Sequence, residues 1–193
     1  LINLQSHPYP QIREQIAEGF RELSKKDLSL EERQFIRQNL GLLIKDSDYR
    51  VRSQVAASFI ALAEKAKEEN SERPPIQTIL FSLLQDQEAS VRQTASYAYL
   101  ALSKNFTHLK ERQSLQMPVS LMLDDSSEYV SSSAVSIFKV MVLNSTTSAE
   151  RLFITRTLTP KIQSSRNITY AFEVGAVFLA LTEKAESLIE RNE

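Results

Sequence analysis

The chain has 193 residues and a net charge of −1, with 42% hydrophobic and 24% charged residues, a composition typical of a folded protein with a substantial core. It has no cysteine, which excludes disulfides, thiolate metal ligands and a cysteine nucleophile. Basic residues are not concentrated in any segment, which argues against a nucleic-acid surface, and no apolar run approaches the roughly 20 residues that span a bilayer.

The first predicted amphipathic helix opens at Ile12, and Ile12, Ile16, Phe20 and Leu23 fall on one of its faces. The preceding segment "LINLQ" aligns with "LGLLI" at 40–44 and is predicted to be the tail of a helix that begins outside the sequence. We therefore expect the first repeating unit to be incomplete and the chain to be an excerpt of a longer array.

The segment 30–44 is predicted to form the next helix, because Ser29 and Glu32 match a capping box at its start. It is followed by "KDSDYRVRSQVAASF", in which Asp46 precedes Val51 and Arg52 and a second amphipathic helix begins. The two helices together form one predicted helix pair.

The same order of elements recurs along the rest of the chain. A helix over 75–85, with Pro74 and Pro75 at its entrance, precedes "QDQEASVRQTASYAY". Helices over 110–123 and 149–162 precede the later copies, and Thr147 with Glu150 forms a second capping box. Each copy therefore predicts a shorter first helix and a longer second helix.

The second helices share one register with a period of about 40 residues. Their opening residues are separated by 39, 40, 39 and 40 positions and are Ile12, Val51, Val91, Val130 and Tyr170. Apolar residues follow each opening residue at offsets of four, eight and eleven, which is the stripe of one helix face. Beside the stripe, a small residue lets a neighbouring helix approach closely in four copies, at Ala17, Ala56, Ser96 and Gly175.

The period, the two helices per unit and the Asp-x4-Val-Arg motif resemble the HEAT repeat over almost the whole chain. The resemblance implies an all-α fold, a right-handed α–α superhelix (solenoid) of about five HEAT-like helix pairs, the first truncated. We expect residues 1–193 to form a single solenoid with units at about 1–27, 28–69, 70–105, 106–144 and 145–193.

In HEAT proteins the motif's Asp and Arg form a ladder between neighbouring units, and the Asp is placed to cap the second helix or to accept from backbone N–H groups at its start. By this resemblance the structural ladder and cap residues are Asp46, Arg52, Asp86, Arg92, Asp125 and Arg13. The motif weakens at Ser131 and Ala171, where looser or differently angled packing is expected.

No residue pattern indicates catalysis or a cofactor. Neither His7 nor His108 lies in a metal-binding motif, and no histidine is placed to activate the serines near Ser131. Asp124 and Asp125 are adjacent on a predicted turn, so their side chains point apart. We therefore predict no enzyme activity, no metal and no cofactor.

A solenoid offers a concave surface lined by its second helices, and residues off the apolar stripe supply it. The candidate partner surface is Arg50, Gln54, Ser90, Thr94, Tyr97, Tyr129, Ser133 and Glu173. Tyr97 and Tyr129 either anchor a partner or pack between neighbouring helices, and the sequence leaves both readings open.

The sequence thus favours a non-catalytic scaffold that binds a protein or peptide, or other domains of its parent chain, inside the cell in the cytoplasm or nucleus, with no membrane contact. One alternative is a nucleic-acid-binding HEAT-like protein. The other is a HEAT-like enzyme such as a bilin lyase or DNA glycosylase, although tryptophan, which the glycosylases use, is absent.

Overall fold

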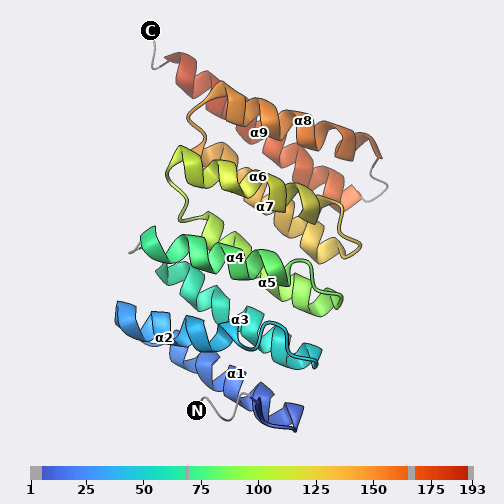
Figure 1. Ribbon diagram of the computed structural model, residues 1–193. Coiled ribbons are helices and arrows are strands. Elements are labelled where there is room, and N and C mark those ends of the chain that lie inside the picture. The colour runs from blue at the N-terminus through green and yellow to red at the C-terminus, as the bar shows by residue number, and fades with distance from the viewer. Residues whose placement is uncertain (1–5, 68–69, 165–167, 191–193) are drawn as a thin grey trace. The chain divides into compact units, whose positions relative to one another are not determined.

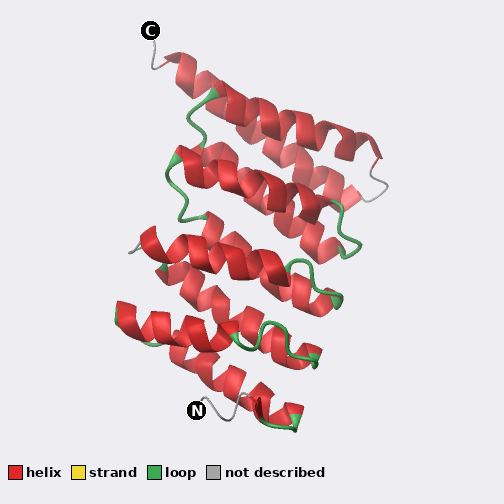
Figure 2. Ribbon diagram, in the orientation of Figure 1, coloured by secondary structure: helices red, strands yellow, loops and turns green. Residues whose placement is uncertain are grey.

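A computed structural model describes residues 6–67, 70–164 and 168–190, and the side chains of 162–164, 168–169 and 186–190 are outside the description. These residues form α-helices joined by short loops, with no strand in the described ranges (Figures 1 and 2). The α-helices are α1 (Pro10–Ser24), α2 (Leu30–Gly41), α3 (Tyr49–Lys65), α4 (Arg73–Leu83), α5 (Ala89–Ser103), α6 (Leu109–Leu123), α7 (Glu128–Asn144), α8 (Ser148–Ser164) and α9 (Ile168–Glu190). A short 3-10 helix, Asn70–Glu72, leads into α4.

The chain divides into two compact units, Leu1–Asn105 and Phe106–Glu193. In unit 1, α3 packs against both α1 and α5, and these three helices form one layer with α2 and α4 on one side of it (Figure 1). In unit 2, α7 packs against α6, α8 and α9. The division falls where the sequence predicts the boundary between two helix pairs.

The predicted starts of the first helices are confirmed by their caps. Ser29 accepts from the backbone N–H of Glu32, whose carboxylate accepts from the Ser29 N–H in return. Thr147 and Glu150 make the same reciprocal bonds at α8. Pro74 lies in the first turn of α4, where its missing N–H costs no helical hydrogen bond.

The apolar stripe of the second helices forms the core. Val51, Val55 and Leu62 of α3 are buried, and so are Val91 and Leu102 of α5. The small residue beside the stripe permits close contact, since the Ser58 hydroxyl of α3 donates to the Ala17 carbonyl of α1 at 3.3 Å.

In α1, however, the stripe is only partly buried, with Phe20 2% exposed. Ile12 is 39% exposed and Leu23 is 47% exposed, whereas their equivalents in α3 are buried. The reason is geometric: α3 covers the Ala17 side of α1, and no helix of the described residues covers the opposite side. A helical stripe identifies an apolar face without showing whether a neighbour is present.

Candidate binding surface

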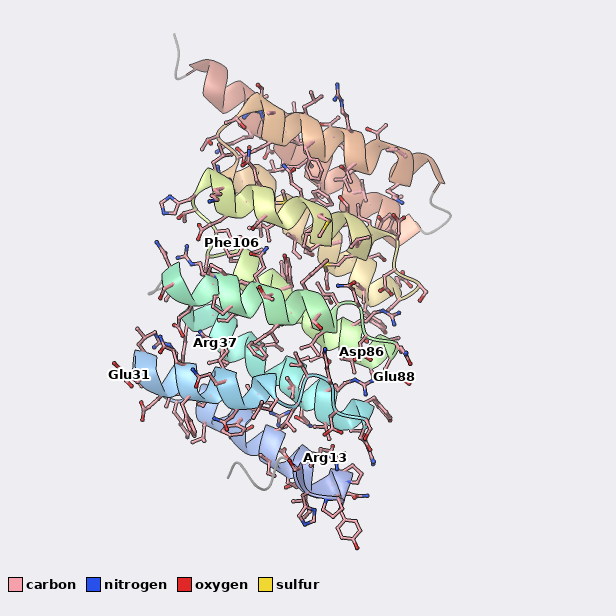
Figure 3. The ribbon with its side chains drawn as sticks, in the orientation of Figure 1. Arg13, Glu31, Arg37, Asp86, Glu88 and Phe106 are labelled. Atoms are coloured by element: carbon pink, nitrogen blue, oxygen red, sulfur yellow. The ribbon has the colours of Figure 1, made fainter. Side chains whose placement is uncertain are left out.

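The predicted ladder residues of unit 1 lie at the starts of the second helices. Arg13 donates from Nε and Nη2 to the Asp46 carboxylate at 2.5 and 2.7 Å. Arg52 donates in the same bidentate way to Asp86 at 2.6 and 2.8 Å. Figure 3 shows Arg13 and Asp86 at the same end of the helix layer. Each pair joins one helix pair to the next, with planar geometry that suits guanidinium and carboxylate.

Each of these aspartates also accepts a backbone hydrogen bond within the turn that contains it. Asp46 accepts from the Asp48 backbone N–H and Asp86 from the Glu88 N–H, both at 2.9 Å. Burial acts to raise the pKa of Asp46, but the bonds from Arg13 and the Asp48 N–H outweigh it and hold the pKa below its ordinary value. Both observations fit a structural role.

Arg92 and Asp125, the next two predicted ladder residues, lie in different units. Arg92 donates from Nη1 to the carbonyls of Asp86 and Gln87, at 2.9 and 3.0 Å, and so closes the turn before α5. Asp125 accepts from the Ser127 N–H at 2.8 Å and closes the turn before α7.

A second ladder, which the sequence reasoning missed, joins the first helices. Arg33 of α2 donates to Glu72 at 2.9 Å, and Arg112 of α6 donates to Glu150 of α8 at 2.6 Å. All four side chains are buried. The signal is present in the sequence as a Glu-Arg dipeptide at 32–33, 72–73, 111–112 and 150–151. Only Glu32 and Glu150 figured in the sequence analysis, as capping residues, so the period of the dipeptide was missed.

Glu150 combines both roles in one carboxylate. Its Oε1 accepts from Arg112, while its Oε2 accepts from the N–H groups of Thr146 and Thr147. Burial acts to raise the pKa of Glu150, but the bonds from Arg112 and the Thr146 N–H outweigh it and lower the pKa to about 2. The buried charge is thereby satisfied on both oxygens.

In unit 1 the candidate surface is a polar row across α1, α3 and α5. Arg21 of α1 donates to Gln54 of α3 at 3.0 Å. The hydroxyls of Ser53 and Thr94 lie 3.5 Å apart between α3 and α5. We call Arg21, Gln54, Thr94 and Tyr97 the polar row; Tyr97 is 42% exposed on α5. Of these residues Gln54, Thr94 and Tyr97 were predicted, whereas Arg21 and Ser53, which link Gln54 to α1 and Thr94 to α3, were not.

The remaining candidates of unit 1 flank this row. Arg50 is exposed at the start of α3 and pairs with Asp48 at 2.7 Å. Ser90 is exposed in the first turn of α5, and its carbonyl accepts from the Thr94 hydroxyl. The cation of Arg50 is thus already matched by a neighbouring carboxylate.

In unit 2 the candidates have different environments. Tyr129 is exposed, and Glu173 lines a groove of about 190 Å³ between α7 and α9 together with Lys139 and Phe172. Ser133 was expected to face a partner, and this is wrong, because it is only 4% exposed. Its hydroxyl donates to the Tyr129 carbonyl one turn earlier, which satisfies it without solvent.

The surface offers hydroxyls, an amide, a guanidinium and aromatic faces, which is a set suited to hydrogen bonding and packing. No group of three or more His, Cys, Asp or Glu residues that could hold a metal ion occurs among the residues that the structure describes. Likewise, none of the described helices is long and apolar enough to cross a membrane.

These helix pairs, stacked by repeated ladders, define a HEAT/armadillo-like α-solenoid. Solved structures share the fold. A designed armadillo repeat protein in complex with the peptide (KR)4 has a TM-score of 0.67 and 17% identity over 93% of this chain and 80% of that one. Kap95p, from a structure describing its binding to RanGDP, has a TM-score of 0.70 and 13% identity over 93% of this chain and 23% of Kap95p.

A further similar structure is a TOG domain array of microtubule polymerases that recruit tubulin, with a TM-score of 0.62 and 15% identity over 94% of this chain and 39% of that one. At these identities the likeness shows the fold alone. No protein-family model and no curated protein sequence matches the chain.

Proposed function

We propose that the chain is a non-catalytic binding module that holds a protein or peptide segment against the polar row of unit 1. The observation that carries the proposal is the polar contact between successive second helices: Arg21 of α1 donates to Gln54 of α3, and the hydroxyls of Ser53 in α3 and Thr94 in α5 lie 3.5 Å apart. Tyr97, three residues after Thr94 on α5, is exposed. A partly exposed tyrosine beside an ordered polar row combines an aromatic anchor with directional donors and acceptors.

The fold comparisons support this proposal at the level of class. The designed armadillo repeat protein binds a peptide, Kap95p binds RanGDP and the TOG array recruits tubulin. Repeat solenoids present extended surfaces built from equivalent positions of successive units, and Gln54 and Thr94 stand at equivalent positions here.

The charge of the surface indicates the kind of partner. Arg21 lies beside Glu18 and Glu22 at 3.3 Å, and Arg50 is paired with Asp48. Because the cations are matched, the surface does not select a strongly acidic partner. We propose a segment with mixed polar and apolar side chains.

Selection from a displayed library of random peptides tests the proposal. Peptides enriched on the wild-type chain are expected to lose at least about tenfold in affinity for a Tyr97→Ala variant, as for an aromatic anchor. Tyr49→Ala is the matched control, since Tyr49 is 46% exposed on α3 and lies outside the polar row. Equal loss with both variants, or enrichment of no peptide, would contradict the proposal.

A further inference from the structure

Unit 2 has a groove between two second helices that pack against each other, α7 and α9 (Figure 1). Its volume is about 190 Å³. Val135 of α7 and Val177 of α9 line it and are 2% and 1% exposed, so the depth of the groove is apolar. Its polar lining is Ser136 and Lys139 of α7 and Glu173 of α9. We call this surface the α7–α9 groove.

The register of the repeat shows which way the two charged side chains face. Glu173 stands at the position of Gln54, which contacts the preceding second helix through Arg21. Lys139 stands at the position of Arg21, which contacts the following second helix. By this register Lys139 faces α9 and Glu173 faces α7. The pair therefore lies between two helices of the chain, away from the outer side of α9.

The two positions are in contact in unit 1 and apart in unit 2. Arg21 donates from Nη1 to the Gln54 amide oxygen at 3.0 Å. Lys139 and Glu173 form no ion pair with each other, and Oε2 of Glu173 is buried with no hydrogen-bond partner in the described part of the chain. A buried charged oxygen without a partner has lost its contacts with water and gained none in exchange. The groove thus contains an acceptor that a donor from a ligand would satisfy.

Both charged groups can meet a ligand without a movement of the helices. Glu173 as a whole is only half-buried. Rotation about the last bond of a glutamate side chain is broad and roughly two-fold, so its two oxygens exchange places at little cost. Lys139 is exposed, and its ammonium group donates from the end of a flexible stem.

The balance of charge in the groove indicates the class of ligand. A cationic group would be attracted by Glu173 and repelled by Lys139, and an anionic group the reverse. A neutral group with one donor and one acceptor satisfies both residues. A primary carboxamide has this pattern, because its NH₂ group donates and its carbonyl oxygen accepts.

The size of the groove indicates how this group is presented. Since a water molecule takes roughly 30 Å³ of the liquid, the groove has room for one side chain and not for a helix or a strand. The aliphatic part of a glutamine or asparagine side chain would lie on Val135 and Val177.

We propose that the α7–α9 groove binds the carboxamide side chain of a glutamine or asparagine from a partner protein. Glu173 accepts from its NH₂ group and Lys139 donates to its carbonyl oxygen, and hydrogen bonds to charged groups are stronger than those between neutral groups. The site is separate from the polar row and does not depend on it. The equivalent positions of α3 and α5 hold Ile60 and Thr94, so this preference belongs to the α7–α9 groove.

Selection from a displayed library of random peptides, followed by charge variants of the chain, tests the proposal. Peptides that bind the wild type and bind Glu173→Lys at least about tenfold more weakly are expected to carry glutamine or asparagine at one fixed position. Replacing that peptide residue with glutamate or lysine is expected to lower the affinity for the wild type at least about tenfold, because either charge meets a like charge.

Reversing one charge of the groove at a time is expected to exchange the preference. Lys139→Glu leaves two carboxylates and is expected to bind the lysine peptide more tightly than the glutamine peptide. Glu173→Lys leaves two ammonium groups and is expected to prefer the glutamate peptide. Glu183→Lys, an exposed position of α9 outside the groove, is the matched control and is expected to leave the preference for glutamine unchanged.

Three results would overturn the proposal. One is a selection that yields no peptide weakened by Glu173→Lys, and another is a fixed charged residue in place of glutamine or asparagine. The third is a preference that does not exchange in the reversed variants. Binding of the same peptides to Tyr97→Ala reports on the polar row, so a failure of the groove is distinguished from a failure of the proposed function.

Discussion

At the residue scale, a single carboxylate both starts a helix and joins two helix pairs. Glu150 satisfies the first N–H groups of α8 with one oxygen and the buried Arg112 with the other. A charged group out of water is tolerated only when its hydrogen-bonding capacity is used, and Glu150 meets this condition. A glutamine at position 150 could still cap α8, but it would leave the buried guanidinium of Arg112 without a carboxylate partner.

We therefore expect Glu150→Gln to lower the free energy of unfolding by about 2–3 kcal/mol. The matched control is Glu32→Gln, which changes an exposed capping glutamate with no arginine partner in the described residues and is expected to cost less than about 1 kcal/mol. Urea unfolding of both variants at low protein concentration measures the difference. Equal losses would show that the buried pair adds nothing beyond the cap.

The same carboxylate makes stability depend on pH. Its pKa in the folded chain is about 2, below the ordinary value of 4.5, so its ionisation favours folding above pH 4.5. This contribution, about 3 kcal/mol at most, is lost as the pH falls from 4.5 toward 2. Urea unfolding at several pH values is expected to show a smaller acid loss in Glu150→Gln than in the wild type. If the free energy of unfolding fell with pH by the same amount in both proteins, the assigned pKa of Glu150 would be contradicted.

Some residue roles could be predicted from the sequence and others could not. The pairing of Arg13 with Asp46 and of Arg52 with Asp86 agrees with the ladder that the resemblance to HEAT repeats implied. The burial of Ser133 could not be predicted, because its offset places it on the surface face and only the packing around α7 decides its exposure. The partner of Glu150 was predictable in principle, since the Glu-Arg dipeptide recurs with the same period as the helices.

At the element scale, the register of the second helices predicted their order and their small-residue contacts. First helices begin within about two residues of the predicted positions because capping residues and prolines mark those starts. What the register could not predict is which helix has an uncovered side. Periodicity gives the same stripe to α1 and α3, although the stripe of α3 is buried and that of α1 is exposed at Ile12 and Leu23.

The close contact between α1 and α3 gives a prediction at this scale. Ala17 is buried where the Ser58 hydroxyl reaches its carbonyl, so a larger side chain would separate the two helices. Ala17→Leu is expected to lower the free energy of unfolding by about 1–3 kcal/mol. Ala57→Leu, the same change at a partly exposed position of α3, is the control and is expected to be nearly neutral. Thermal or urea unfolding measures both variants. An Ala17→Leu variant as stable as the wild type would show that the contact between α1 and α3 accepts a larger side chain.

At the scale of the whole molecule, charge separates a protein-binding role from a nucleic-acid-binding one. The chain has 23 basic and 24 acidic residues, and the described ladders pair many of them internally. Phosphate contacts would require uncompensated cations and would give a steep dependence on salt. Titration with labelled DNA and RNA at two salt concentrations is expected to show no saturable binding. Tight binding that weakens steeply with salt would favour the nucleic-acid alternative.

The central claim is that unit 1 binds a protein segment along the polar row of α1, α3 and α5. The most direct measurement is a map of amide chemical-shift changes on adding a selected peptide to the isotope-labelled chain. The account predicts that the largest changes cluster at Arg21, Gln54, Thr94 and Tyr97 and disappear in Tyr97→Ala. Changes confined to α2 and α4, or a pattern unaltered by Tyr97→Ala, would contradict it.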